Sequence, residues 1–325
     1  MFALLEILFL LIGSFGLFAA ISPKLRTEAW WLRIWTYSRL QFCILLALSA
    51  LLYVALFPVS SLLSIIILSL HSIAFVMCAA DIWPYLPGQP KEVPRAPHDA
   101  TGAKLSILLI NVLQENQDHA AVLDRIHDAN ADIVFLCETS DAWRNALSDM
   151  EADYPYTYLL PREEHNGLLF YSRLPIQTVQ ERYLCQDHIP SLTIDVDLQG
   201  EEIRLYCIHP RPPRPRDKPE HLDDELMIVA DELREQDRPA MVIGDFNEVG
   251  WSWMVREFKR HARLCDPKRG RGLYNTFSAQ NPLLAWPLDH AFVTNDFYLT
   301  GMRRLPACGS DHYPILYGFQ RRKTG

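Results

Sequence analysis

The sequence Ile243-Gly244-Asp245-Phe246-Asn247 directly follows the apolar run Pro239–Val242, which predicts a buried strand. Asp245 and Asn247 are two residues apart, so their side chains point to the same face of an extended chain. The end of such a strand can carry a general base together with a group that orients water. Asp and Asn also favour turns, and a strand that ends in an Asx-type turn is the alternative interpretation.

A second cluster of acidic and basic side chains, Gly309–Ile315, opens another apolar run and contains Asp311 and His312. Four more polar residues stand at the ends or starts of apolar runs: Asn111, Glu138, His209 and Asp289. Together, in this order, the segments resemble the endonuclease/exonuclease/phosphatase superfamily. This is a superfamily of metal-dependent phosphoesterases that includes nucleases, inositol phosphatases and sphingomyelinases. The resemblance spans residues 105–319, which is nearly all of the chain after residue 100.

The pattern after residue 104 predicts a catalytic domain over 105–325 that mixes strands and helices. Strand 105–112, helix 119–129 and strand 133–137 form a strand–helix–strand unit, which places Asn111 and Glu138 at neighbouring strand ends. A second helix is expected over 140–150. Several consecutive strands follow, which favours two packed sheets with helices outside. The resemblance implies an α/β fold, the four-layer α/β/β/α sandwich, with the site at one edge of the β-sandwich.

Three apolar runs precede this domain, at residues 2–22, 40–57 and 61–80. Each is about as long as the ~20 residues that a membrane-spanning helix needs. They are apolar on all faces, unlike the amphipathic helices of a soluble hairpin. We expect a membrane anchor at 1–83 with three transmembrane helices that contact the lipid bilayer through residues 2–80. No basic residue precedes the first run, which argues against a cleaved signal peptide.

The distribution of basic residues predicts the orientation of the anchor. Basic residues occur between the first two runs and after the third run, and are absent from the other flanks: Lys24, Arg26, Arg33, Arg39, Lys91, Arg95 and Lys104. The positive-inside rule places these flanks, and the catalytic domain, on the cytoplasmic side. We expect a protein of the bacterial inner membrane, with an external catalytic domain as the alternative.

Residues 84–104 contain five prolines and few apolar side chains. Such a composition predicts an extended linker between anchor and catalytic domain. It also suggests that the catalytic domain folds without the first hundred residues.

The resemblance implies a Mg²⁺ site, with Mn²⁺ as a possible substitute. Glu138 is the first expected ligand, because a carboxylate that ends a buried strand is costly unless it is paired or bound to metal. Asn111 would help to hold the metal or a phosphate, and Asp311 would reach the metal or its waters. The family often has an acidic residue two positions after this Asn, where the chain has Leu113, so we expect a single metal.

The resemblance also implies the catalytic roles. Asp245 would be the general base, Asn247 would orient water or a phosphate oxygen, and His209 would donate to a phosphate oxygen. His312 would lie against the phosphate, and Asp289 would bond to His312 and fix its tautomer. We expect two further histidines, His165 and His290, to be structural or peripheral.

These features predict a membrane-anchored hydrolase of phosphate esters with phosphodiesterase or nuclease chemistry. The alternatives are a phospholipid or inositol-phosphate phosphatase on the same site, and an inactive, membrane-tethered protein that binds a phosphorylated ligand. The net charge of −8 argues against long duplex DNA. Two basic stretches are interpreted as solvated loops: one with Arg211, Arg214 and Arg216, and one at Lys268–Gly272. The first stretch is the better candidate for holding an anionic substrate.

Overall fold

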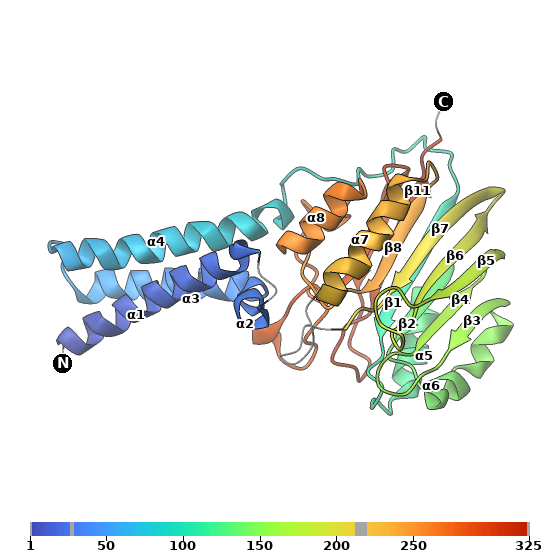
Figure 1. The fold of residues 1–325 in the computed structure, drawn as a ribbon, viewed down its shortest axis with the longest axis horizontal. Helices are drawn as coiled ribbons and strands as arrows, with labels where there is room; N and C mark the ends of the chain where they lie inside the picture. The colour runs from blue at the N-terminus through green and yellow to red at the C-terminus, as the bar shows by residue number, and fades with distance from the viewer. Residues whose placement is uncertain (1, 27–28, 212–219, 324–325) are drawn as a thin grey trace.

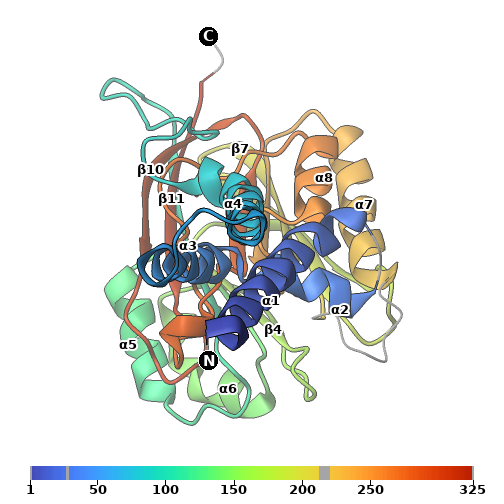
Figure 2. The same ribbon diagram turned by 90° about the vertical axis from the view of Figure 1, so that its left-hand side faces the viewer.

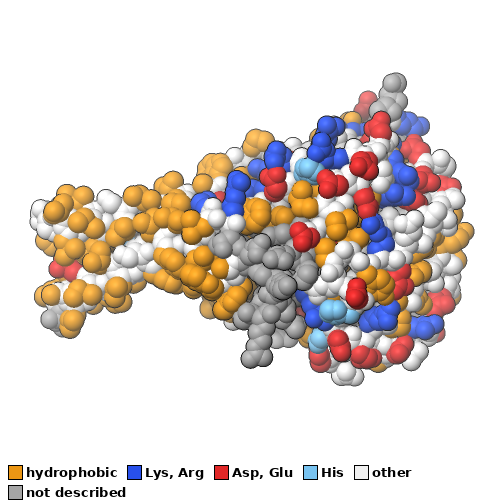
Figure 3. Space-filling view, viewed as in Figure 1, with side chains coloured by type: hydrophobic (Ala, Val, Ile, Leu, Met, Phe, Trp, Pro, Cys, Tyr) orange, Lys and Arg blue, Asp and Glu red, His pale blue; other side chains and the backbone are white. Residues whose placement is uncertain are grey.

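The computed structural model of the chain describes residues 2–26, 29–211 and 220–323. Three long helices form a rod that projects from one side of a domain of sheets and helices (Figure 1). They are α1 (Phe2–Ile21), α3 (Arg39–Leu56) and α4 (Leu62–Ile82). All three are long and apolar enough to cross a membrane, and apolar side chains cover the visible face of the rod (Figure 3).

The end of the rod nearest the domain holds a set of charged side chains. The carboxylate of Asp81 lies 3.0 Å from Lys24 Nζ and 2.9 Å from Arg39 Nε. Between α1 and α3 the chain forms the short helix α2 (Trp30–Arg33) and a 3₁₀ turn at Ile34–Thr36. The view along the rod shows α2 beside α1, on the side of the domain that carries the rod (Figure 2).

The domain contains two mixed sheets. The first has the order β10-β11-β1-β2-β4-β3 and the second the order β5-β6-β7-β8-β9. The first sheet comprises β1 (Lys104–Asn111), β2 (Ile133–Cys137), β3 (Tyr156–Leu160), β4 (Leu168–Ser172), β10 (Phe297–Arg304) and β11 (Ile315–Arg321). The second comprises β5 (Ile176–Arg182), β6 (Ser191–Leu198), β7 (Glu201–Ile208), β8 (Ala240–Asp245) and β9 (Asp289–Val293).

Three apolar clusters separate four layers, which confirms the expected sandwich. The central cluster joins the sheets, with Phe135 and Ile243 among its members. A second cluster packs α5 (His119–Ala129) and α6 (Asp141–Ala146) on the first sheet, and a third packs α7 (Glu220–Arg234) and α8 (Trp253–His261) on the second.

One strand and one helix end differ from the sequence prediction. The edge strand β10 was not predicted, because only Phe297 and Leu299 are buried in it and the rest is largely exposed. The helix expected over 140–150 ends at Ala146 and continues as a 3₁₀ turn at Ser148–Ala152.

The proline-rich segment contains several turns and bends, and it lies against the catalytic domain instead of crossing solvent. Val93 is 1% exposed and belongs to the central core. The Glu92 carboxylate accepts hydrogen bonds from Lys259 and Arg269. Arg95 forms an isolated bridge with Leu299 of β10. A free linker would not make these contacts. A segment with few apolar residues can still pack against a folded domain.

The anchor and the catalytic domain share an apolar cluster at their junction. Val249, Trp251 and Leu288 pack with residues from α1, α3 and α4. Trp251 donates from Nε1 to the carbonyl of Thr36 at 2.8 Å. The proline-rich composition suggested a catalytic domain that folds independently of the first hundred residues. The structure instead buries loops of this domain against the three long helices.

Candidate active site

Polar side chains from both sheets meet at one edge of the sandwich. Strands β1 and β2 run parallel and place Asn111 opposite Cys137, the residue before Glu138. Strands β7 and β8 run parallel. His209 directly follows the end of β7, and Asp245 is the last residue of β8. Asp245 pairs with Asp289 across β8 and β9. Because parallel strands end at the same edge, residues distant in sequence become neighbours.

Asn111 links the two sheets. Its Nδ2 atom donates to Glu138 Oε1 at 2.8 Å and to Asp245 Oδ2 at 3.0 Å. Its Oδ1 atom accepts the backbone N–H of Leu113 at 3.0 Å. Asn111 therefore presents its nitrogen to the carboxylates, which suits a residue that positions them better than a direct metal ligand.

Asp245 is 1% exposed and its Oδ1 atom accepts the backbone N–H of Asn247 at 2.9 Å. Burial raises the pKa of Asp245, but the neighbouring rings of His312 and His209 and the Asn111 amide outweigh it and lower that pKa below its usual value. The carboxylate is therefore ionised at neutral pH. Asn247 donates from Nδ2 to the carbonyl of Pro210 at 3.0 Å, which ties the loop after β8 to the loop after β7.

His312 lies between two carboxylates. Its Nδ1 atom is 2.8 Å from Asp289 Oδ2 and its Nε2 atom is 3.5 Å from Asp245 Oδ2. Burial disfavours the charged ring, but Asp289 and Asp245 outweigh burial and raise the pKa of His312 to about 10. The pair of His312 and Asp289 matches the arrangement expected from the sequence.

His209 is 7% exposed, and neither ring nitrogen has a hydrogen-bond partner among the described residues. Its Nε2 atom lies 3.8 Å from Asp245 Oδ2 and 3.9 Å from Glu138 Oε1. Buried polar atoms nearly always have a partner. The ring is therefore placed to donate to an oxygen of a bound ligand.

Glu138 has a partner that we expected from the sequence to be structural or peripheral. Its Oε2 atom is 2.9 Å from Nδ1 of His165, whose other nitrogen lies 3.1 Å from Glu115 Oε1. By contrast, His290 fits its expected structural place. It is 1% exposed, its Nε2 atom is 3.0 Å from the carbonyl of Glu248, and burial lowers its pKa to about 3.

The donor set fits a hard divalent cation. Asp311 is half-buried, and burial together with the carboxylates of Glu138 and Asp245 raises its pKa. Such clustering of carboxylates is costly without a cation, and Mg²⁺ and Mn²⁺ prefer oxygen ligands of this kind. Asp245, Asp289 and His312 also offer ligand atoms within 4.8 Å of one another. Since His312 bonds Asp289 directly, we favour Glu138 and Asp311 as the ligands.

Three residues that the sequence analysis did not assign to the site support it. Ser310 donates from Oγ to the carbonyl of Asn111 at 2.7 Å and accepts the N–H of His312 at 3.0 Å. Thr276 accepts the N–H of Asp289 at 3.2 Å, and buried Lys268 donates to the Asp289 carbonyl at 2.5 Å. The Ser next to Asp311 was a usable signal in the sequence, but loop contacts 13 or 21 residues away were not.

The second basic stretch is not a solvated loop. Lys268 is buried, Arg269 pairs with Glu92, and Arg271 donates to carbonyls of Pro267 and Val93. In the first stretch, Arg214 and Arg216 lie outside the described residues.

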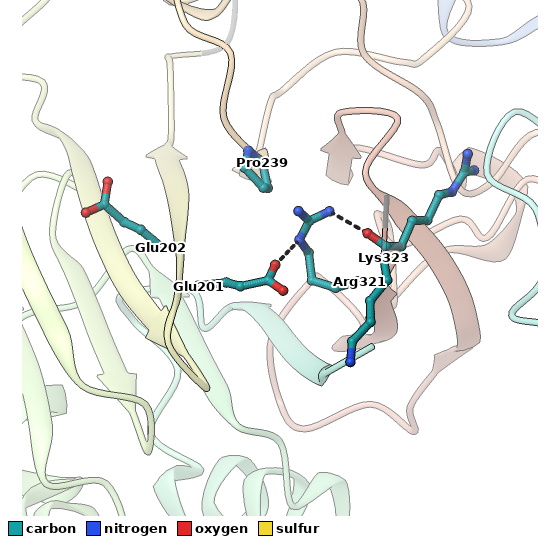
Figure 4. Close-up of a pocket in the computed structure, with 6 residues that line it drawn as sticks. Glu201, Glu202, Pro239, Arg321 and Lys323 are labelled. Carbon is teal, nitrogen blue, oxygen red and sulfur yellow. Dashed lines mark hydrogen bonds and ion pairs between the residues drawn. The ribbon is translucent and has the colours of Figure 1, made fainter. Parts of the chain in front are cut away.

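The hollow shown in Figure 4 is remote from these side chains. It lies at the opposite end of β7 and is lined by Glu201, Glu202, Pro239, Arg321, Arg322 and Lys323. An ion pair between Arg321 and Glu201, 2.8 Å long, occupies part of it. None of the expected site residues lines it.

Comparisons with known proteins agree with this geometry. The model of the "Endonuclease/Exonuclease/phosphatase family" matches residues 108–312. A comparison with curated proteins gave no match. Three similar solved structures show the same fold. The family protein from Beutenbergia cavernae has 18% identity and a TM-score of 0.57, and the match covers 68% of this chain and 72% of that one.

The second is TDP2 from D. rerio, complexed with a single-strand DNA product. It has 17% identity and a TM-score of 0.57, with 67% of this chain and 99% of that one covered. The third is a family protein from Bacteroides thetaiotaomicron. It has 16% identity and a TM-score of 0.54, with 68% and 96% covered.

Proposed function

The chain belongs to the endonuclease/exonuclease/phosphatase family, and from this premise we propose that it is a membrane-anchored, Mg²⁺-dependent hydrolase of phosphate esters. The observation that carries the proposal is the hydrogen-bonded chain from Glu138 through Asn111 to Asp245, beside the pair of His312 and Asp289. It supplies an ionised base, imidazole donors and carboxylates in one buried place.

We propose a division of the chain into an anchor at 1–83, a connecting segment at 84–104 and a catalytic domain at 105–325. The three apolar helices support contact with a lipid bilayer through residues 2–80. The basic residues of the connecting loops favour the cytoplasmic side of a bacterial inner membrane.

Glu138 and Asp311 would hold Mg²⁺, or Mn²⁺ in its place, and Asn111 would position the Glu138 carboxylate. When bound, the cation supplies neutralisation of the charge on the phosphate. His209 and His312 would donate N–H groups to phosphate oxygens, where negative charge develops. Asp289 would keep the His312 ring oriented, with its Nδ1 proton held on the Asp289 side.

Asp245 would remove a proton from water as the water oxygen forms a bond to phosphorus. The ester P–O bond breaks, the leaving oxygen takes up a proton and becomes an alcohol, and Asp245 returns its proton to solvent. Asn247 would hold the water or a phosphate oxygen beside this base. The products are the alcohol and the phosphate, and the reaction consumes one water.

A substrate panel tests this function on the full chain in detergent. With Mg²⁺ or Mn²⁺ we expect hydrolysis of some phosphate esters among single-stranded nucleic acids, inositol phosphates, phospholipids and bis(p-nitrophenyl) phosphate. Asp245→Asn should lower the turnover rate by at least ~10²-fold, the low end for acid–base catalysis. Glu138→Ala should abolish the stimulation by metal without lowering the melting temperature.

An inactive protein that only binds phosphorylated ligands is the competing hypothesis. It predicts ligand binding with no turnover of any ester, and equal behaviour of the chain and its Asp245→Asn variant. Turnover that Asp245→Asn abolishes would reject it.

A further inference from the structure

The catalytic domain exposes an apolar turn beside the base of the anchor. The 3₁₀ turn Pro282–Leu284 carries Leu283, which is 77% exposed, and Leu284, which is 47% exposed. Gln41, in the first turn of α3, donates from Nε2 to the carbonyl of Leu283 at 2.9 Å. The turn is therefore level with the first turn of a helix that is long enough to span a membrane.

Other exposed apolar side chains continue this surface. Trp30, Trp31 and Ile34 of the segment between α1 and α3 are exposed, as are Ile44 and Leu45 one turn further along α3. Scattered exposed apolar residues are common on soluble proteins. Here they adjoin three membrane-length helices, and tryptophans are enriched where proteins meet the membrane–water interface. A bilayer that surrounds the rod would cover them.

The exposed turn is part of the same loop as the active site. At its start, the Phe277 ring lies 5.1 Å from the His312 ring. Trp286 stacks on Phe277 at 5.8 Å and meets the Tyr37 ring at 5.6 Å. The loop ends at Asp289, the partner of His312. The exposed turn and His312 are thus joined by a few packed aromatic rings.

The anchor also holds the loop that follows Asp245. Tyr37 donates from Oη to the carbonyl of Asn247 at 2.7 Å. Arg33 lies 3.4 Å from the Glu248 carboxylate, and the side chains of Arg33 and Glu248 are both buried. The hydrogen bond between Trp251 and Thr36 continues this contact. The loops beside the candidate active site are therefore held against the base of the three helices on two sides.

We propose that the turn Pro282–Leu284 and helix α2 sit in the interfacial layer of the membrane that holds the anchor, and that the substrate is a phosphate ester carried by a lipid of that membrane. The substrate class rests on the proposed hydrolase function, whereas the contact of the turn with lipid does not. Water adds to the head-group phosphorus and one P–O bond breaks, so no further reactant is required.

The depth of the turn is measured with the full chain in phosphatidylcholine vesicles. Leu283→Cys is labelled with an environment-sensitive fluorophore, and Glu202→Cys, at the opposite end of β7, is the matched control. The unsubstituted chain reports labelling of native cysteines. We expect lipids that carry a spin label on the acyl chain to quench the fluorophore at residue 283. The fluorophore at residue 202 should not be quenched. Equal accessibility of both sites to a water-soluble quencher would overturn the lipid contact.

The substrate class is tested by comparing two rates in the same vesicles. Phosphatidic acid and phosphatidylglycerol serve as lipid esters, and bis(p-nitrophenyl) phosphate as the soluble ester. In the double variant Leu283→Ser with Leu284→Ser, the ratio of lipid to soluble rate should fall about fivefold, given the membrane preference of two leucines. Both side chains are exposed, so the fold should tolerate the change.

The outcomes separate the two proposals. Hydrolysis of the soluble ester or of single-stranded DNA, with no hydrolysis of either lipid, overturns the lipid substrate and leaves the hydrolase. An unchanged rate ratio in the double variant overturns the role of the turn in lipid hydrolysis. Absence of any hydrolysis with Mg²⁺ or Mn²⁺ overturns the proposed function, while quenching at position 283 still decides the lipid contact.

Discussion

Asp245 remains ionised in a place where water has almost no access. The cost of burying its charge is offset by two imidazoles and an amide nitrogen. The same neighbours would face the phosphate, so ground-state stability and chemistry depend on one set of contacts. A base that is ionised at neutral pH does not need to lose a proton before it accepts one from water.

His312 and Asp289 should behave as one unit. Asp289→Asn should lower turnover mildly, because the ring loses the anion that orients it and favours its protonated form. Combined with His312→Ala, it should add little to the cost of His312→Ala alone, as expected for groups that act together. The measurement is kcat for the two single variants and the double variant. Costs that multiply would show that the two residues work independently.

Glu225, in α7, should make stability depend on pH. It is 6% exposed, and burial raises its pKa from 4.5 to about 7. Between these values the unfolded chain releases the proton and the folded chain keeps it, so stability falls as pH rises to 7 and stays low above. At about 1.4 kcal/mol per unit, Glu225→Gln should stabilise the protein by up to about 3 kcal/mol at pH 8.

The check on Glu225 is the melting temperature in detergent at two pH values. The variant and the parent should melt alike at pH ~4, where the carboxyl is protonated in both states. Asp224→Asn, at the exposed neighbouring position, is the control and should have little effect at either pH. A Glu225→Gln gain that is equal at both pH values would contradict the titration.

Residue types at strand ends were enough to predict which side chains meet, but not how they bond. The amide of Asn111 turns its nitrogen to Glu138 and Asp245 because its oxygen caps the following turn. That choice depends on the backbone after β1. His165 reaches Glu138 from the loop between β3 and β4, and no local pattern marks such a reach.

At the scale of elements, the parallel pair β7–β8 sets the spacing between His209 and Asp245. Gly244 has φ +142°, and a Cβ there would lie 1.9 Å from the carbonyl oxygen of Ile208. Only glycine permits this close approach of the two strands at the site.

Gly244→Ala should therefore destabilise the protein by at least about 2 kcal/mol, from the positive φ and the overpacking together. It should also displace His209 and Asp245 and lower turnover in the protein that remains folded. Gly301→Ala in β10 is the matched control, because nothing lies within 4 Å of its Cβ position. The readouts are melting temperature and turnover. Equal stability of the two variants would contradict the argument.

Elements with strong periodicity were predictable to within a residue or two, as for α5 and β2. The edge strand β10 was not, since a strand that is largely exposed has no apolar alternation to mark it. The short helix α2 was missed for a related reason: it is four residues long, which is too short to show an apolar period.

For the whole molecule, the sequence predicted three long apolar helices but not their tight contact with the domain of sheets. Val93, among prolines, is an unremarkable residue in the sequence, yet it completes the core between the sheets. Val249 and Trp251 follow strand β8 and pack on the three long helices. Contacts between parts of the chain that are each plausible alone leave no periodic signal.

The side of the membrane follows from the base of the anchor. Lys24 and Arg26 flank α1 at the end that carries the catalytic domain. We therefore expect this end of α1 and the catalytic domain to be cytoplasmic. A C-terminal green fluorescent protein should fluoresce, and a C-terminal alkaline phosphatase should be inactive. The reverse pattern would place the catalytic domain outside.

Val93 is buried in the core between the sheets, and Tyr37 is hydrogen-bonded to the loop after β8. These contacts restrict rotation of the catalytic domain relative to the three helices. A tethered enzyme with a loose linker samples a volume. In a bilayer, a domain held in this way would only translate and rotate with its anchor in the plane of the membrane. Its search for the proposed lipid substrate would then be two-dimensional. Its rate should follow the mole fraction of substrate in the surface and not the bulk concentration, so diluting the substrate with inert lipid should slow it even when the total amount is unchanged.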